Sequence, residues 1–342
     1  MDRILITAAG GDVAQAVAKA LRLSPTALEL HATEMRDGIA LVFFDTFHRV
    51  PGANDPGYVD ALCRICDAHQ ITAVFPVSEP EIRALMVLPS YPALPNGVPI
   101  VAQSRSFVEE YGDKLRCCER LDGVVPLAPF ADGRDAGAVE RFVAELGFPV
   151  CVKERVAYGS KGIVIAKDAA ALSLALARFP TPLLQGVIEG EDQEFSVGVF
   201  STDSEHRVIS MRRLLGLGNC SWFAEVSEPG AVVAYCRAIA EQVKTKGSFN
   251  IQLRLTSAGP RLLEINTRLS SLTAARAAAG FNDALWTLEQ RLGKPISPCR
   301  PIPAGFRFQR YLGEVVDLGH GFTPVPQWLP LQRNGHGDAS VQ

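Results

Sequence analysis

Long apolar runs are missing from this chain, since no stretch approaches the ~18 apolar residues of a membrane helix. An excess of basic residues is also missing: Lys and Arg number 34 and Asp and Glu 37, so the formal charge is -3. No global positive field therefore favours nucleic acid. Residues 1–3 lead directly into an apolar run, without the layout of a secretory signal. We expect a cytoplasmic protein with neither nucleic-acid nor membrane partners.

Metal-hydrolase and disulfide patterns are missing too. The six histidines are scattered and form no HExxH motif, and the eight cysteines are expected to be reduced thiols. Cys63 and Cys66 form one CxxC, but no second pair follows and the surrounding residues 58–69 look helical. A structural zinc site needs four ligands. We therefore favour helix-face or core cysteines over a zinc or redox site.

The first hundred residues alternate strand-like and helix-like patterns. Such alternation indicates a parallel, doubly wound sheet. The length of 342 residues suits two or three domains. The expected strands are 3–7, 28–33, 71–77 and 98–101, and the expected helices are 13–22 and 58–69. After Gly10-Gly11 the third glycine of a GxGxxG fingerprint is missing, which favours a plain strand-to-helix turn over a dinucleotide site.

Carboxylates follow two of these strands. Glu34 and the segment 78–81, expected to be a turn, fall where the carboxyl ends of parallel strands form a ligand crevice. For these carboxylates, contact with a substrate and a place in an exposed turn are equally well supported. Prolines predict a loop over 84–97, and residues 104–121 look helical. Beyond these, the pattern predicts strands at 195–200, 207–211 and 249–255 and a helix at 229–245.

Three later segments carry residues suited to a nucleotide. In the first, a strand presents Lys153, and the loop of Gly159, Ser160, Lys161 and Gly162 follows it. A cation can meet phosphate oxygens, and small residues let backbone N–H groups approach them. The loop alone is equally well explained as an ordinary hairpin turn.

In the second segment, Gln252 lies on one strand and Glu264, Asn266 and Arg268 follow along the next. Residues two apart on a strand share a face, and carboxylate and amide oxygens suit Mg²⁺. Arg268 can then reach a developing phosphoryl charge. Alone, this spacing is typical of a solvated strand face; the preceding Gln-bearing strand favours a metal site.

In the third segment, residues 183–196, an apolar strand leads into a glycine-containing turn and an acidic strand start. Backbone groups of Val187 and Ile188 are placed to read the edge of adenine, and Glu194 to accept from ribose hydroxyls. Arg212, Arg213 and Glu225 are candidates for the acceptor side, with surface residues as the equal alternative.

Together these motifs resemble the ATP-grasp superfamily, and most of all its carbamoyl-phosphate-synthase-like carboxylate–amine ligases. The similarity spans roughly residues 1–290. It rests on Asp113-Lys114, the strand before Lys153 with its loop, Gln185 through Glu194, Asn250-x-Gln252 and Glu264-x-Asn266-x-Arg268. Departures from the family pattern are Gly186 in place of an acidic residue, Thr267 in place of proline, and Ser160-Lys161 within the glycine-rich loop.

The resemblance implies an α/β ATP-grasp fold with an N-terminal Rossmann-like pre-ATP-grasp domain over 1–103. It further implies a linker and small lobe over 104–184, and a central domain with a C-terminal extension over 185–342. Implied nucleotide-binding residues are Lys114, Lys153, Gly159, Ser160, Gly162, Gln185, Val187, Ile188, Glu194 and Gln252. Implied Mg²⁺ ligands are Gln252, Glu264 and Asn266, with Mn²⁺ as a substitute, and implied catalytic residues are Arg268, Lys153 and Lys161.

The implied activity is that of an ADP-forming ligase. ATP would phosphorylate a small-molecule carboxylate, and an amine, such as an amino acid or a small peptide-like compound, would displace the phosphate. The alternative is an inactive ATP-binding regulator or scaffold, and the presence of a complete metal set argues against it. A homodimer is compatible with the sequence, which does not determine the oligomeric state.

Overall fold

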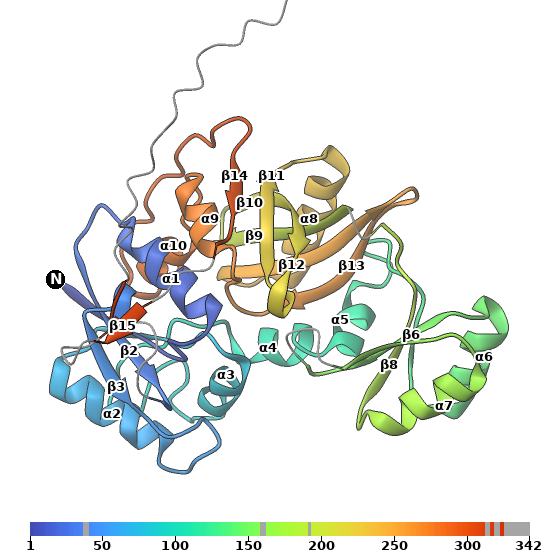
Figure 1. Cartoon of the computed structure of the whole chain (residues 1–342), viewed down its shortest axis with the longest axis horizontal. Coiled ribbons are helices and arrows are strands. Elements are labelled where there is room, and N and C mark those ends of the chain that lie inside the picture. The colour runs from blue at the N-terminus through green and yellow to red at the C-terminus, as the bar shows by residue number, and fades with distance from the viewer. Residues whose placement is uncertain (37–40, 158–161, 191–192, 312–314, 318–321, 325–342) are drawn as a thin grey trace, which may run out of the picture.

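The computed structural model describes residues 1–36, 41–157, 162–190, 193–311, 315–317 and 322–324 (Figure 1). Gly159, Ser160 and Lys161, which were expected to cover the phosphates, lie outside these ranges. Across the described residues the chain forms an N-terminal parallel sheet, a small antiparallel sheet and a larger antiparallel sheet. No helix in these ranges is both long enough and apolar enough to span a bilayer.

The N-terminal sheet has the strand order β3-β2-β1-β4, with parallel pairing throughout. Its side chains alternate between two apolar layers, as a strand requires: Ile4 and Ile6 pack with one helix, whereas Leu5 packs with another. Helices therefore cover both faces, and the doubly wound prediction is confirmed. The elements are β1 (Asp2–Ile6), α1 (Asp12–Arg22), β2 (Leu28–Glu34), β3 (Thr46–Arg49), α2 (Tyr58–His69), β4 (Ala73–Phe75) and α3 (Glu79–Met86).

Three local predictions are wrong in this part of the chain. The strand expected at 98–101 is reduced to isolated bridges, because Pro99 has no N–H to donate to a ladder. The strand expected over 71–77 shortens to β4, which ends before Pro76. The expected turn at 78–81 is the start of α3, which also takes the first residues of the expected loop 84–97.

The helix expected over 104–121 is two helices, α4 (Arg105–Tyr111) and α5 (Lys114–Leu121). The break comes at Gly112 and Asp113. Asp113 adopts an extended backbone, and its carboxylate accepts from the N–H groups of Leu115 and Arg116. Aspartate at this position is a strong helix N-cap, so the sequence starts a new helix here and places Lys114 at its first residue.

The small sheet has the order β5-β8-β6-β7 and lies at the right of Figure 1. Phe142 of α6 and Leu172 of α7 pack with Val150 and Leu184 in one apolar cluster. The elements are β5 (Phe130–Asp132), α6 (Ala136–Leu146), β6 (Val150–Glu154), β7 (Ile163–Ala166), α7 (Ala169–Arg178) and β8 (Pro182–Gly186). The domain boundary expected after residue 184 falls within β8, whose pairing with β6 continues to Gly186.

The larger sheet has the order β13-β12-β9-β10-β11-β14. On β9, Val197 and Val199 pack with α8, whereas Phe200 on the other face packs with Trp286 of α10. The elements are β9 (Glu194–Ser201), β10 (His206–Leu215), β11 (Ser221–Val226), α8 (Gly230–Val243), β12 (Gly247–Thr256), β13 (Gly259–Asn266), α9 (Thr273–Ala278), α10 (Asp283–Arg291) and β14 (Arg307–Gln309). A separate hairpin joins β15 (Val315–Asp317) to β16 (Phe322–Pro324).

One apolar core joins segments that lie far apart in sequence. Ala277 and Leu285, from α9 and α10, share a cluster with Ile4, Val17 and Leu30 of the N-terminal sheet and helix. Asn282 donates from Nδ2 to the carbonyl of Ala20 over 2.8 Å. The N-terminal sheet therefore packs directly on helices that follow the larger sheet.

Candidate functional site

A cavity of ≈ 570 Å³ lies between the small sheet and the larger sheet. Side chains of both sheets and of the segment between them line it, and Lys114 reaches it from α5. The cavity thereby brings together most of the sequence-predicted nucleotide residues and the predicted Mg²⁺ ligand Glu264. These nucleotide residues are Lys114, Lys153, Gln185, Val187, Ile188, Glu194 and Gln252. This volume suits a nucleotide-sized ligand.

Lys153 is a buried cation on β6, with 6% of its surface exposed. Its Nζ donates to Oε1 of Gln185 over 2.7 Å, and Gln185 lies on the neighbouring strand β8. Burial lowers the pKa of Lys153, against the opposing influence of Cys151 and Glu264. An ammonium held in a poorly hydrated site is strongly attracted to an anionic ligand.

Lys114 and Glu264 form the second charged feature. The Nζ of Lys114 lies 3.3 Å from Oε2 of Glu264 and donates to the carbonyl of Ala157 over 2.9 Å. Burial works to raise the pKa of Glu264, but the positive charges of Lys114 and Lys153 outweigh it and hold that pKa below its usual range. Glu264 is therefore a carboxylate at neutral pH and can act as a metal ligand.

Asn266 completes this feature from the same strand. Its Nδ2 lies 3.4 Å from Oε1 of Glu264, and the register pairs Glu264 with Gln252 and Asn266 with Asn250. The predicted shared face of Gln252, Glu264 and Asn266 is therefore present. The oxygens of Glu264 and Asn266 form a donor set of the kind that Mg²⁺ prefers.

Gln252 and Glu194 belong instead to a network of arginines. Arg213 lies 2.7 Å from Oε1 of Glu194 and donates to Oε1 of Gln252 over 2.8 Å. Arg254 contacts Oε2 of Glu194 at 3.2 Å and donates to the carbonyl of Ile188 over 2.7 Å. Glu194 is thus a doubly paired buried carboxylate, and the network connects the floor of the cavity to the 187–188 segment.

The pattern missed this role for Arg213, which was considered for the acceptor side together with Arg212 and Glu225. Neighbouring residues of a strand point to opposite faces. Arg213 therefore enters the cavity from β10, whereas Arg212 pairs with Glu225 at 2.6 Å on the other face. Strand alternation in residues 206–215 is the sequence signal that separates the two arginines.

Gly162 is the one residue of the expected phosphate loop that the described ranges include. Its φ of +88° is a backbone conformation that glycine adopts without strain. A small pocket beside the main cavity is lined by Gly162 together with Lys114, Lys153 and Glu264. The start of β7, which follows this loop, therefore lies close to the charged groups of Lys114, Lys153 and Glu264.

Arg268 and Glu79 mark the side of the site that faces the N-terminal sheet. Arg268 donates from one terminal nitrogen to the carbonyl of Leu269 over 2.9 Å, and its buried Nε has no hydrogen-bond partner among the described residues. Burial raises the pKa of Glu79, while the charges of Arg268 and Lys114 act in the opposite direction. The sequence placed Glu79 at a strand end but offered no sign that it would lie within the electrostatic influence of Arg268.

The other carboxylates at these strand ends have structural partners. Glu81 is buried and accepts from the hydroxyls of Thr7, Ser78 and Tyr58, at 2.6, 2.6 and 3.0 Å. Glu34 accepts from the N–H of Gly10 over 3.0 Å and so braces the first strand-to-helix turn. Neither behaves as a simple exposed turn residue.

The sequence analysis also did not predict that His31, His48 and His69 form a cluster. They come from β2, β3 and α2, so their spacing of 17 and 21 residues matches no metal-binding motif. Burial lowers the pKa of His31, with Glu29 opposing, and lowers that of His48 to about 4. Cys63 and Cys66 lie on α2 as expected.

Comparison with known proteins agrees with this geometry. Residues 178–311 match the family model "ATP-grasp in the biosynthetic pathway with Ter operon", and residues 4–93 match the model "PylC-like, N-terminal domain". The arginine-specific large chain of carbamoyl phosphate synthase from Geobacillus stearothermophilus is 23% identical over 187 residues, which are 51% of this chain and 18% of that protein. The chain therefore spans less than a fifth of that relative.

Solved structures show the same fold. N5-carboxyaminoimidazole ribonucleotide synthetase in its ADP complex superimposes with a TM-score of 0.68 and 15% identity, over 88% of this chain and 79% of that one. The biotin carboxylase domain of 2-oxoglutarate carboxylase from Hydrogenobacter thermophilus gives 0.69 and 15%, over 87% and 71%. The chain therefore has the ATP-grasp fold, with residues 178–311 matching an ATP-grasp family and residues 4–93 matching a PylC-like N-terminal domain.

Proposed function

We propose that this protein is an ATP-dependent, ADP-forming ligase that activates a small-molecule carboxylate as an acyl phosphate and joins it to an amine. The observation that carries the proposal is the convergence of Lys114, Lys153 and Glu264 on one cavity between the two antiparallel sheets. A buried cation, Lys153, and a half-buried one, Lys114, beside a charged carboxylate suit a triphosphate with its metal. Related structures in this superfamily hold ADP.

The nucleotide would enter between the two sheets. Lys153 and Lys114 would contact its phosphate oxygens, with Lys153 exchanging its bond to Gln185 for the phosphate. Apolar side chains of the cavity, including Ile163 and Ile165 of β7, would cover the base, and backbone groups at 187–188 would read its edge. Arg254 holds the carbonyl of Ile188 and so fixes the geometry of that segment.

The donor set at the end of β13 fits Mg²⁺. Glu264 is kept ionised by two lysines and Asn266 lies beside it, whereas the oxygen of Gln252 is engaged by Arg213. Glu264 and Asn266 would therefore hold the ion, with Gln252 contributing more weakly. A bound Mg²⁺ would neutralise charge on the phosphates during transfer.

The carboxylate substrate would approach from the side of Arg268 and Glu79. Its oxygen attacks the γ-phosphorus of ATP, the bond to the β,γ-bridging oxygen breaks, and ADP leaves. Arg268 and the lysines stabilise the charge on the transferring group, which is the main catalytic contribution in phosphoryl transfer. An amine then attacks the acyl carbon and releases phosphate, so the closed site must exclude water from the intermediate.

The products of nucleotide turnover test this proposal. The protein is incubated with ATP, Mg²⁺ and a panel of carboxylates and amines, singly and in pairs, and the nucleotides are separated by chromatography. We expect ADP in proportion to a new amide bond, and hydroxylamine should trap the activated carboxylate as a hydroxamate. Glu264→Gln is the matched control, because it preserves shape but removes the metal-binding charge, and it should abolish ADP formation.

Other outcomes would contradict the proposal. Stoichiometric AMP and pyrophosphate would indicate attack at the α-phosphate and exclude this mechanism. ATP that binds but stays intact with every pair would favour a nucleotide-binding regulator. Equal turnover by the wild type and Glu264→Gln would show that Glu264 is not a required Mg²⁺ ligand.

A further inference from the structure

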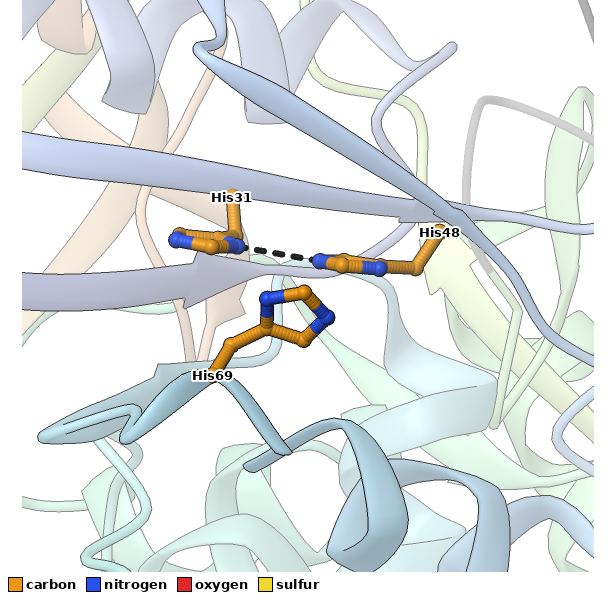
Figure 2. Close-up of side chains that lie close together, drawn as sticks. All are labelled: His31, His48 and His69. Atoms are coloured by element: carbon orange, nitrogen blue, oxygen red, sulfur yellow. Dashed lines mark hydrogen bonds between the residues drawn. The ribbon is translucent and has the colours of Figure 1, made fainter. Parts of the chain in front are cut away.

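Three imidazole rings converge on the face of the N-terminal sheet that α2 covers. Figure 2 shows His31 and His48 edge to edge, with the ring of His69 reaching toward them from the end of its helix. One ring nitrogen from each residue can be chosen so that all three lie within 4.8 Å of one another. His31 is buried, and the other two are half-buried. The chain thus folds three of its six histidines into one place.

Hydrogen bonds orient the most buried ring. Nε2 of His31 lies 2.9 Å from Oε1 of Glu29, whose Oε2 accepts from Nε of Arg3 over 2.9 Å. Because the carboxylate is an acceptor, Nε2 carries the proton and Nδ1 of His31 keeps its lone pair. That lone pair points into the cluster, at Nε2 of His48 2.9 Å away. A carboxylate behind a histidine is the usual support of a metal-binding imidazole.

The spacing suits one small cation. Two nitrogen ligands at ~2.1 Å from a tetrahedral Zn²⁺ lie roughly 3.4 Å apart. The nitrogens of this cluster, separated by 2.9 Å in the closest pair and all within 4.8 Å, bracket that distance. Small rotations of the two half-buried rings would bring all three to bonding distance, and a water molecule would serve as the fourth ligand.

We propose that His31, His48 and His69 form a binding site for a divalent transition metal of the Zn²⁺ type, separate from the nucleotide cavity. Imidazole nitrogens favour Zn²⁺, Co²⁺, Ni²⁺ or Cu²⁺, whereas Mg²⁺ takes the oxygen ligands of the other site. The bound ion ties β2 and β3 to the last residue of α2 and stabilises the N-terminal sheet. Its ligands lie outside the set that lines the nucleotide cavity.

Cobalt provides the direct test, because its visible spectrum reports coordination. Purified full-length protein is stripped with a chelator and titrated with Co²⁺ alone, and Zn²⁺ binding is measured by calorimetry. We expect one equivalent per chain, the intense visible bands of four-coordinate cobalt, and no near-ultraviolet sulfur-to-metal band. The absence of that band excludes binding through the cysteines, without any variant.

Variants then assign the ligands. His48→Ala and His69→Gln change half-buried residues and should weaken metal binding at least ~10-fold. Glu29→Gln should weaken it roughly 10- to 100-fold, because Glu29 positions the ring of His31 and does not bind the metal itself. His206→Ala is the control, since His206 bonds Ser201 in the larger sheet. Zn²⁺ should raise the melting temperature of the wild type and of His206→Ala but not of His48→Ala. An absence of binding by the wild type, or equal affinity in all variants, would overturn the proposal.

Discussion

Individual side chains of the cavity are held by other side chains. Lys153 bonds Gln185, Lys114 contacts Glu264, and Glu194 is shared by two arginines. Such mutual bonds limit the number of rotamers and prepare the charged groups for a ligand. Each lysine therefore has a defined partner to exchange for a phosphate.

Replacement of Lys153 by alanine should weaken nucleotide binding. The change removes a buried cation from the cavity, and hydrogen bonds to charged groups contribute enough for a loss of roughly 10- to 100-fold. Calorimetry with a non-hydrolysable ATP analogue and Mg²⁺ measures the dissociation constant. Lys167→Ala, an exposed lysine of the same lobe, is the control and should bind as the wild type does. An unchanged constant in Lys153→Ala would show that this lysine makes no phosphate contact.

A second residue-scale prediction concerns a fully buried ion pair. Arg276 and Asp283 lie 2.7 Å apart with no exposed side-chain surface. Asp283→Ala leaves the guanidinium buried without its counter-charge, so the free energy of unfolding should fall by about 3–5 kcal/mol. Asp203→Ala breaks the exposed pair with Lys246 and should change it by less than ~0.5 kcal/mol. Chemical denaturation measures both, and equal effects would argue against a burial penalty.

At the scale of elements, one ion pair connects α5 to the small sheet. Asp113 caps α5 and lies 2.8 Å from Arg155, just beyond β6, while the N–H of Lys114 donates to the carbonyl of Arg155. Burial works to raise the pKa of Asp113, but the hydrogen bond from Arg155 holds that pKa below its usual range. The orientation of Lys114 thus depends on a contact between two elements.

This contact makes a pH prediction. A carboxyl group whose folded pKa is lowered stabilises the protein above its unfolded pKa, and this contribution disappears as pH falls through the folded value. Asp113→Asn keeps the helix cap but loses the charge, so it should cost about 1–3 kcal/mol at pH 7. The gap to the wild type should begin to narrow at roughly pH 4 and should close as the pH falls through the lowered folded pKa of Asp113. Urea unfolding over this pH range measures it, and a gap that stays constant would contradict the assignment.

Elements with strong periodicity were predictable from sequence. α2 begins and ends at the expected residues, and α1 and α8 differ by a residue or two. Errors came where tertiary context or proline decides: Pro99 prevents a strand, and Asp113 divides a helix. The apolar pattern through residues 104–121 is the same for one helix as for two, because the capping geometry interrupts it only locally.

For the whole molecule, motif order was enough to identify the superfamily and its fold, as the family models confirm. The grouping of Lys114, Lys153 and Glu264 followed from that resemblance, whereas their roles remain predictions. Strand alternation could have separated Arg213 from Arg212. The surroundings of Glu79 and of the histidines were not predictable, because packing between elements distant in sequence brings their neighbours together. Residues 31, 48 and 69 meet only once β2, β3 and α2 are assembled.

The packing of α9 and α10 on the N-terminal sheet has a consequence for synthesis on the ribosome. β1 and α1 emerge first, yet Ala277 and Leu285, which cover them, are made some 270 residues later. At about 5–20 residues per second, the early segment waits at least ten seconds with part of its apolar surface uncovered. A nascent chain halted before α9 should therefore be protease-sensitive in residues 1–100 and engage chaperones, and one halted well beyond α10 should not.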